Sequence, residues 1–169
     1  MALKLSTGRV AFPIEFDNGD VQNIYFNPSD PELGTRFVAA NEAITKRMED
    51  LEIKDIELDP TGEPVNVSDF ENFDDITETQ AEYIKKRAAV ISEVTAQTKK
   101  IIYEELDKAF DSDVSSVVFK YCSPLAIVNG EYFITAFLKA ITPEIRKYVE
   151  KSTVEAQRRM NKHIGKYIK

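Results

Sequence analysis

Apolar and polar residues alternate near the start of the chain. Every second residue from 10 to 16 is apolar: Val10, Phe12, Ile14 and Phe16. This period of two is typical of a half-buried strand. Asn18-Gly19 follows it, a pair that favours the tight type I′ turn of a β-hairpin. Pro13 has no backbone N–H to donate, so the first strand is predicted to be an edge strand.

The return strand carries its apolar residues at an irregular spacing. Val21 is followed by Ile24 and Phe26, and the odd step from 21 to 24 would place the later side chains on the opposite face. A β-bulge near Gln22-Asn23 would restore the register. The sequence therefore predicts a hairpin over residues 9–26 with a bulge in its second strand.

A helix is predicted over residues 30–55. Two alternatives describe its start: Ser29 and Glu32 form a capping box, or Asp30 caps the helix with Pro31 as its first residue. Apolar residues then recur at steps of three and four: Leu33, Phe37, Ala40, Ile44, Met48 and Leu51. One apolar stripe of this kind indicates a helix packed on a core.

An acidic connector and the longest helix follow. Residues 56–76 contain two prolines, a glycine and many carboxylates, so we expect a connector that is mobile over residues 55–75. A helix is predicted over residues 77–110. Its apolar face carries Ile84, Ala88, Ile91, Val94, Thr98, Ile101 and Leu106.

Residues 113–169 are predicted to form short helices and a basic C-terminal helix. Asp111-Ser112-Asp113 ends the long helix and supplies a cap for a short one, and a turn is expected at Asn129-Gly130. A further helix is predicted to stop at Thr142-Pro143, where the last helix begins. The predicted fold class is α+β and mainly α, a single domain with an N-terminal β-hairpin followed by a bundle of about four to five helices.

Charge is distributed unevenly along the chain. The formal net charge is −7, which argues against nucleic acid as a partner. Residues 49–82 contain thirteen acidic residues against one basic, whereas residues 139–169 contain nine basic against three acidic. Two interpretations stay open: solvated faces that keep the protein soluble, or head-to-tail attraction between copies or toward a charged partner.

Residues that could perform catalysis are scarce. His163 is the single histidine and has no Asp, Glu, Ser or Cys three or four positions away, and Cys122 is the single cysteine. The phosphate-binding and nucleophile motifs are missing from the sequence. Apolar runs are only a few residues long, and the N-terminus has no apolar signal-peptide core. We therefore expect a cytoplasmic protein that is not an enzyme, with no cofactor, metal or membrane partner.

Two segments resemble a known family. Residues 21–31, Val-Gln-Asn-Ile-Tyr-Phe-Asn-Pro-Ser-Asp-Pro, are similar to the opening of small proteins encoded in the tail modules of long-tailed phages and prophages of Gram-positive bacteria. Ser123-Pro124, the Val-Asn-Gly-Glu turn at 128–131 and the Phe-Leu-Lys-Ala-Ile-Thr-Pro run at 137–143 resemble the closing segment of their tail assembly chaperones. The resemblance implies a tail assembly chaperone.

The resemblance also implies partners and a place of action. Such chaperones coat the helical tape measure protein and recruit tail tube subunits, and they often form homo-oligomers. They act in the cytoplasm of the infected bacterial host and leave before the virion matures. The alternative hypothesis is a phage structural connector or a small regulatory protein that binds a host factor.

Four apolar residues are the candidate partner-binding residues: Phe37, Ile44, Ile91 and Val94. We expect a groove between the first helix and the long helix, with these side chains left over after the core is packed. The competing interpretation is that all four belong to the core, as residues of helical stripes usually do.

Overall fold

The computed structural model describes residues 3–58 and 78–164 and has a mainly helical α+β fold. The elements in chain order are β1 (Val10–Glu15), β2 (Val21–Phe26), α1 (Leu33–Leu58), α2 (Glu78–Phe110), α3 (Ser115–Val118), β3 (Ile127–Val128), β4 (Glu131–Tyr132) and α4 (Phe133–Ile164). The predicted fold class, a β-hairpin followed by helices, is confirmed.

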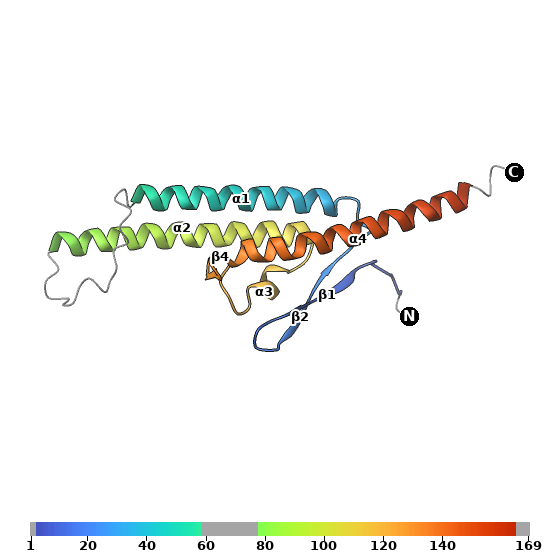
Figure 1. Cartoon of the computed structure of the whole chain (residues 1–169), viewed down its shortest axis with the longest axis horizontal. Helices are drawn as coiled ribbons and strands as arrows, with labels where there is room; N and C mark the ends of the chain where they lie inside the picture. The colour runs from blue at the N-terminus through green and yellow to red at the C-terminus, as the bar shows by residue number, and fades with distance from the viewer. Residues whose placement is uncertain (1–2, 59–77, 165–169) are drawn as a thin grey trace.

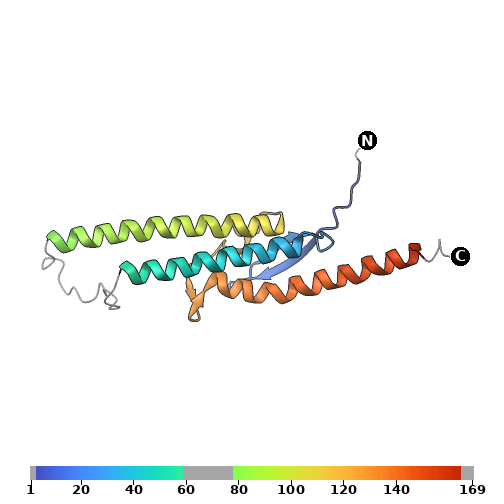
Figure 2. The ribbon, with the colours of Figure 1, turned by 90° about the horizontal axis from the view of Figure 1, so that it is seen from above.

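The three long helices give the molecule an elongated shape (Figures 1 and 2). α1 and α2 run antiparallel and side by side. α4 begins beside the middle of α1 and continues past its N-terminal end, and the β1–β2 hairpin and α3 lie below the helices in Figure 1. One core joins these elements, and its largest fully buried hydrophobic side chains are Phe26, Phe110, Ile24, Leu33, Ile44, Ile102, Leu106, Ile134, Val114 and Val118.

The β1–β2 ladder is continuous, so the predicted bulge at Gln22-Asn23 is wrong. Val21 is 53% exposed and opposite Glu15, whereas Gln22 takes the inward position opposite Ile14. The odd step from 21 to 24 arises because Val21 does not belong to the core face. The irregularity lies in the turn instead, at Gly19.

The turn between β1 and β2 is not the predicted type I′ turn. A type I′ turn needs positive φ at both central residues, and only Gly19, with φ of 79°, has it in this turn. The N–H of Gly19 donates to Phe16 O at 2.8 Å, and the N–H of Phe16 donates to Asp20 O at 2.9 Å. These bonds describe a three-residue loop with a glycine bulge.

Pro13 lies on an edge strand, as predicted, because β1 pairs only with β2 in the described chain. The bond from the N–H of Phe16 to Asp20 O sets the alternation of hydrogen-bonded pairs along the ladder. Pro13, opposite Asn23, therefore falls at a non-hydrogen-bonded pair and loses no ladder bond.

The hairpin tip is fastened to the segment after α3 by one carboxylate. Asp20 accepts hydrogen bonds from Gln22 Nε2 at 2.9 Å, Tyr121 Oη at 2.8 Å and Lys120 Nζ at 3.0 Å. These bonds, with that of Gln22 contributing most, lower the pKa of Asp20 from its ordinary value of 3.8 to about 2. The Tyr121 ring also packs edge-on against Phe16, with ring centroids 5.2 Å apart.

We expect this contact to make stability depend on pH in the acid range. Because the folded pKa of Asp20 lies below its unfolded value, the contribution is present above about pH 4 and is lost as pH falls toward 2. Urea unfolding midpoints at several pH values measure this, with Asp20→Asn as the variant. Asp30, whose pKa is also lowered by the Glu32 N–H and Arg36, titrates in both proteins. Equal slopes between pH 4 and 2 in both proteins would contradict the prediction.

Asp30 caps the turn that leads into α1, which favours the second of the two alternatives, although α1 itself begins at Leu33 and not at Pro31. Its Oδ1 accepts the N–H of Glu32 at 2.9 Å, and its Oδ2 accepts a bond from Arg36 Nη2 at 2.7 Å. The hydroxyl of Ser29 lies instead 3.1 Å from that of Ser152 on α4. Asp30, and not Ser29, is therefore the capping residue.

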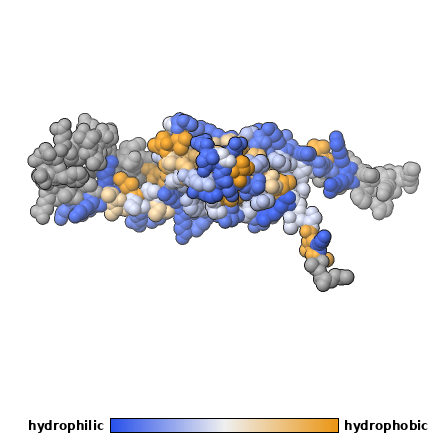
Figure 3. All heavy atoms as spheres, turned by 90° about the horizontal axis from the view of Figure 1, so that it is seen from below, coloured by the Kyte–Doolittle hydropathy of each residue, from blue (hydrophilic) through white to orange (hydrophobic). Residues whose placement is uncertain are grey.

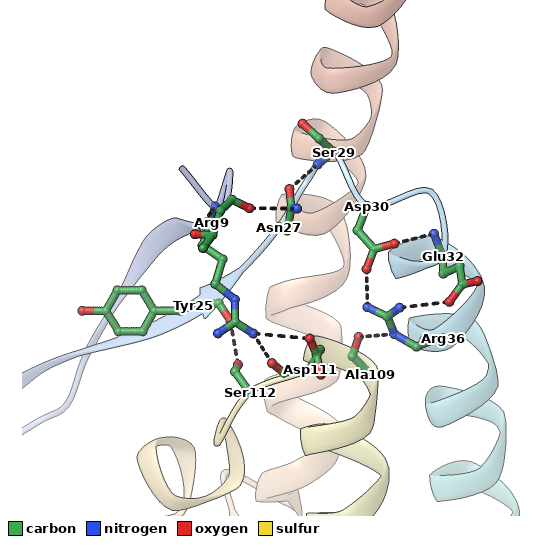
Figure 4. Close-up of polar contacts among 11 residues, drawn as sticks. Arg9, Tyr25, Asn27, Ser29, Asp30, Glu32, Arg36, Ala109, Asp111 and Ser112 are labelled. Atoms are coloured by element: carbon green, nitrogen blue, oxygen red, sulfur yellow. Dashed lines mark hydrogen bonds and ion pairs between the residues drawn. The ribbon is translucent and has the colours of Figure 1, made fainter. Parts of the chain in front are cut away.

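Two arginines hold the C-terminal end of α2 (Figure 4). Arg36 Nε donates to Ala109 O at 3.3 Å, and Arg9 Nη2 donates to Asp111 O. The last carbonyl groups of a helix lack partners within it and carry partial negative charge, so guanidinium groups are favourable there. These bonds connect α1 and the segment before β1 to the end of α2.

The short helix α3 is capped from α2 and not by the predicted Asp111-Ser112-Asp113 run. Asp107 Oδ1 accepts the N–H of Ser115 at 2.7 Å, and its Oδ2 accepts the Ser115 hydroxyl at 2.8 Å. Asp111 has a φ of 49° and ends α2 at the predicted position. The predicted turn at Asn129-Gly130 is confirmed: both residues have positive φ and connect β3 to β4.

The prediction of two helices meeting at Pro143 is wrong, because α4 continues through this proline. Pro143 is exposed, whereas Ile141 and Ile145 on either side are 2% and 3% exposed and belong to the core. Packing on both sides of the proline thus keeps the helix on the body. α1 extends to Leu58, past the predicted end at 55, and the rest of the predicted connector at 56–76 lies outside the described residues.

Candidate functional site

A cleft of about 310 Å³ lies between α1, β4 and the first turns of α4. Its floor is apolar and consists of Ile44, Met48 and Leu138, which are 1%, 7% and 7% exposed. Its walls are polar: Asn41, Thr45 and Glu49 on α1, and Thr135, Lys139 and Thr142 on α4. An apolar floor between polar walls is the usual composition of a binding cleft.

Helical spacing produces this arrangement. Ile44 and Met48 are four residues apart, so they lie one above the other on α1. Thr45, the next residue along from Ile44, is exposed at the rim. The wall from α4 carries a positive charge at Lys139, whose Nζ pairs with Glu131 on β4, while Glu49 is exposed on the α1 wall.

The β3–β4 hairpin extends the apolar surface beyond the cleft. Tyr132 of β4 lines the cleft, and Ile127 of β3 is its direct cross-strand partner. Side chains directly opposite each other in an antiparallel pair lie on the same face of the sheet. Ile127 is 71% exposed, so a large apolar side chain stands beside the cleft wall.

Exposed hydrophobic side chains occur in separate places on the surface. Figure 3 shows orange areas on a mostly hydrophilic face, one of them on the N-terminal segment that extends away from the body. In that segment Leu3 and Leu5 are 83% and 78% exposed. The cleft differs from these areas because its apolar residues form the floor of a concave surface with polar walls.

The structure places the four predicted partner-binding residues in different surroundings. Phe37 and Ile44 are 6% and 1% exposed and belong to the core, although Ile44 also forms part of the cleft floor. Val94 is 9% exposed and Ile91 is 39% exposed. For Phe37, Ile44 and Val94 the burial matches the core interpretation, and for Ile91 contact with a partner stays a prediction.

Sequence reasoning expected a groove between α1 and α2, and the cleft lies between α1 and α4. It missed Tyr132, which follows a predicted turn. It placed Met48 in the apolar stripe of the first helix and Leu138 in the run at 137–143, without distinguishing either from the core. The only sequence feature that could have indicated the cleft is the run of Asn41, Thr45 and Glu49 beside the α1 stripe.

Groups for catalysis or metal binding do not gather at the cleft. Cys122 is partly buried, with its Sγ 3.6 Å from Ser123 O, and the side chain of His163 lies outside the described part of the structure. Within residues 3–58 and 78–164, no three His, Cys, Asp or Glu side chains are grouped to hold a metal ion. Among the described helices, none has the length and apolar character needed to cross a membrane.

Comparison of the chain with protein-family models, with curated proteins and with solved structures found no match.

Proposed function

We propose that this protein is a tail assembly chaperone of a long-tailed phage or prophage. It binds the tape measure protein, recruits tail tube subunits in the cytoplasm of the bacterial host, and leaves before the virion matures. The observation that carries the proposal is the cleft with Ile44, Met48 and Leu138 on its floor. The tape measure protein is proposed as the partner because residues 21–31 and 123–143 resemble this family.

The cleft suits the apolar face of a helix. Ile44 and Met48 are one helical turn apart, a spacing that matches anchor side chains at i and i+4 on a partner helix. Tape measure proteins are long helical chains whose apolar faces would aggregate if left exposed. A chaperone with a net charge of −7 that covers such a face keeps the complex soluble.

Coexpression with a tape measure fragment tests the proposal. We expect the wild-type chain to keep the fragment soluble and to copurify with it. Thr45→Arg places a long charged side chain at the exposed rim of the cleft, so it should weaken binding about tenfold or more, or ~1.4 kcal/mol. Thr35→Arg, on an exposed position of the same helix outside the cleft, is the matched control and should bind as the wild type does.

Two outcomes would contradict the proposal. A fragment that stays insoluble with the wild-type chain would favour the structural connector or the host-factor-binding protein. Equal binding by Thr45→Arg and Thr35→Arg would show that the cleft is not the binding site.

A further inference from the structure

α1 and α2 extend beyond the region that α4 covers. In Figures 1 and 2 the two helices continue side by side past the start of α4 as a two-helix projection. The start of α4 lies level with Met48 and Glu49, because Tyr132 and Thr135 line the same cleft as these residues. We name residues 49–58 of α1 and residues 78–94 of α2 the distal arm.

The distal arm has an apolar face that no third helix covers in the described part of the structure. Ile91 lies on the same face of α2 as Thr98 and Ile102, because seven and eleven residues make nearly whole numbers of turns. Thr98 and Ile102 are fully buried in the body, yet Ile91 is 39% exposed, and Ala88 is also exposed. On α1, Leu51 continues the buried stripe and is only partly buried.

At the opposite end of the molecule, the last turns of α4 have no neighbouring helix or strand among the described residues (Figure 1). Tyr148 and Val149 still pack on the core, and Ser152 contacts Ser29. Beyond them α4 continues to Ile164 and projects away from the body (Figure 1). Val154 is 49% exposed there. We name residues 153–164 the C-terminal arm; a helix of this length is marginal in water without packing.

The α1 part of the distal arm and the C-terminal arm are similar in length and opposite in charge. The C-terminal arm is about 18 Å long and the α1 part of the distal arm about 15 Å, at 1.5 Å per residue. Residues 49–58 carry five acidic residues against one basic, and residues 153–164 carry three basic residues against one acidic, whereas residues 78–94 carry three of each sign. The arms lie at opposite ends of the molecule, so they can meet only between different copies (Figure 1).

We propose that the C-terminal arm of one copy docks along the distal arm of a second copy, next to Leu51, Ala88 and Ile91. It takes the place beside α1 that α4 takes in the body. The contact joins different surfaces on the two copies, so it produces head-to-tail chains, or a ring if the rotation closes. Opposite charge makes the contact stronger at low salt. The proposal does not depend on the tape measure protein.

Sedimentation velocity of the full-length protein over a range of concentrations tests this docking. The mean mass of the wild type should rise above 19.2 kDa with concentration, more at low salt than at high salt. Ile91→Asp should weaken self-association about tenfold or more, because it places a charge in the apolar contact. Val90→Asp is the matched control: Val90 is 42% exposed but lies about 100° around the helix from Ile91, so assembly should persist.

Mixing two variants tests the head-to-tail arrangement. The full-length variant with Arg158→Glu and Arg159→Glu has an altered C-terminal arm, and Ile91→Asp has an altered distal arm. At a concentration where each variant alone is monomeric, a mixture should form dimers and stop, because one intact arm of each kind remains. Circular dichroism confirms that the variants are folded.

Three results would overturn the proposal: a wild type that stays monomeric at all concentrations, self-association unaffected by Ile91→Asp, or a mixture in which no dimers form.

Discussion

Replacing Phe110 with alanine is expected to lower the free energy of unfolding by about 3–5 kcal/mol. Phe110 is 1% exposed, and its ring packs edge-on against Phe26 and Phe37 with centroids 5.9 Å and 5.7 Å away. Phe26 in turn contacts Tyr148 at 5.4 Å. These rings come from α2, β2, α1 and α4, so a cavity at Phe110 would loosen the contact between four elements.

Urea unfolding measures this loss, with Tyr25→Ala as the control. Tyr25 is an aromatic residue on β2 but is 50% exposed, so its truncation should change the free energy of unfolding by about 0.5 kcal/mol or less. Single domains have a free energy of unfolding of about 5–15 kcal/mol. Phe110→Ala should therefore remove a large share of the stability of the protein. A loss equal to that of Tyr25→Ala would contradict the central role of the aromatic cluster.

The helices were predictable because their apolar stripes persist over many turns. Leu33, Phe37, Ala40, Ile44 and Met48 recur at helical spacing and are all buried. The end of α2 at Phe110 was predictable from the polar run Asp111-Ser112-Asp113 that follows it. The apolar stripes and the end of α2 are both set by residues close together in the chain, so one sequence is enough to predict them.

The register of the hairpin was not predictable from side-chain type. An apolar Val21 was assigned to the core face, yet the structure turns Gln22 inward. A polar side chain is tolerated there because its amide bonds to Asp20, which also binds Lys120. That arrangement depends on the segment after α3, about a hundred residues away, and no local pattern contains it.

The cleft and the distal arm could not be predicted for a similar reason. Phe37, Ile44, Val94 and Ile91 belong to stripes that look alike in the sequence. Ile91 is exposed in the distal arm beyond the start of α4, whereas Val94 is buried within that arm and Phe37 and Ile44 are buried in the body (Figure 2). The start of α4 is a tertiary feature, so the sequence indicates apolar faces and the structure decides which remain uncovered.

The cleft and the distal arm adjoin each other on α1. Met48, on the cleft floor, and Leu51, on the distal arm, lie one turn apart on α1. A partner helix in the cleft and the C-terminal arm of a second copy would therefore lie close together. Addition of the tape measure fragment should shift the protein concentration at which self-association is half complete. A shift to higher concentration means that the two contacts compete, and a shift to lower concentration means that they support each other.

Replacing Pro143 with alanine is expected to raise the free energy of unfolding by about 1–3 kcal/mol. A proline within a helix removes one hydrogen bond and crowds the carbonyl four residues earlier, at a cost of about 3 kcal/mol relative to alanine. Pro143 is exposed within the continuous helix α4, so alanine would lose no core packing. The added freedom of the unfolded chain offsets only about 0.4–1 kcal/mol of this gain.

Pro31→Ala is the matched control for this substitution. Pro31 is also exposed, but it lies just before α1, where the missing N–H costs nothing, so its replacement should bring no gain in the urea unfolding midpoint. A higher urea unfolding midpoint for Pro143→Ala, with no change for Pro31→Ala, would show that α4 is one continuous helix that Pro143 destabilises. A lower midpoint would mean that the chain needs the proline where it is, which is incompatible with a continuous helix through residue 143.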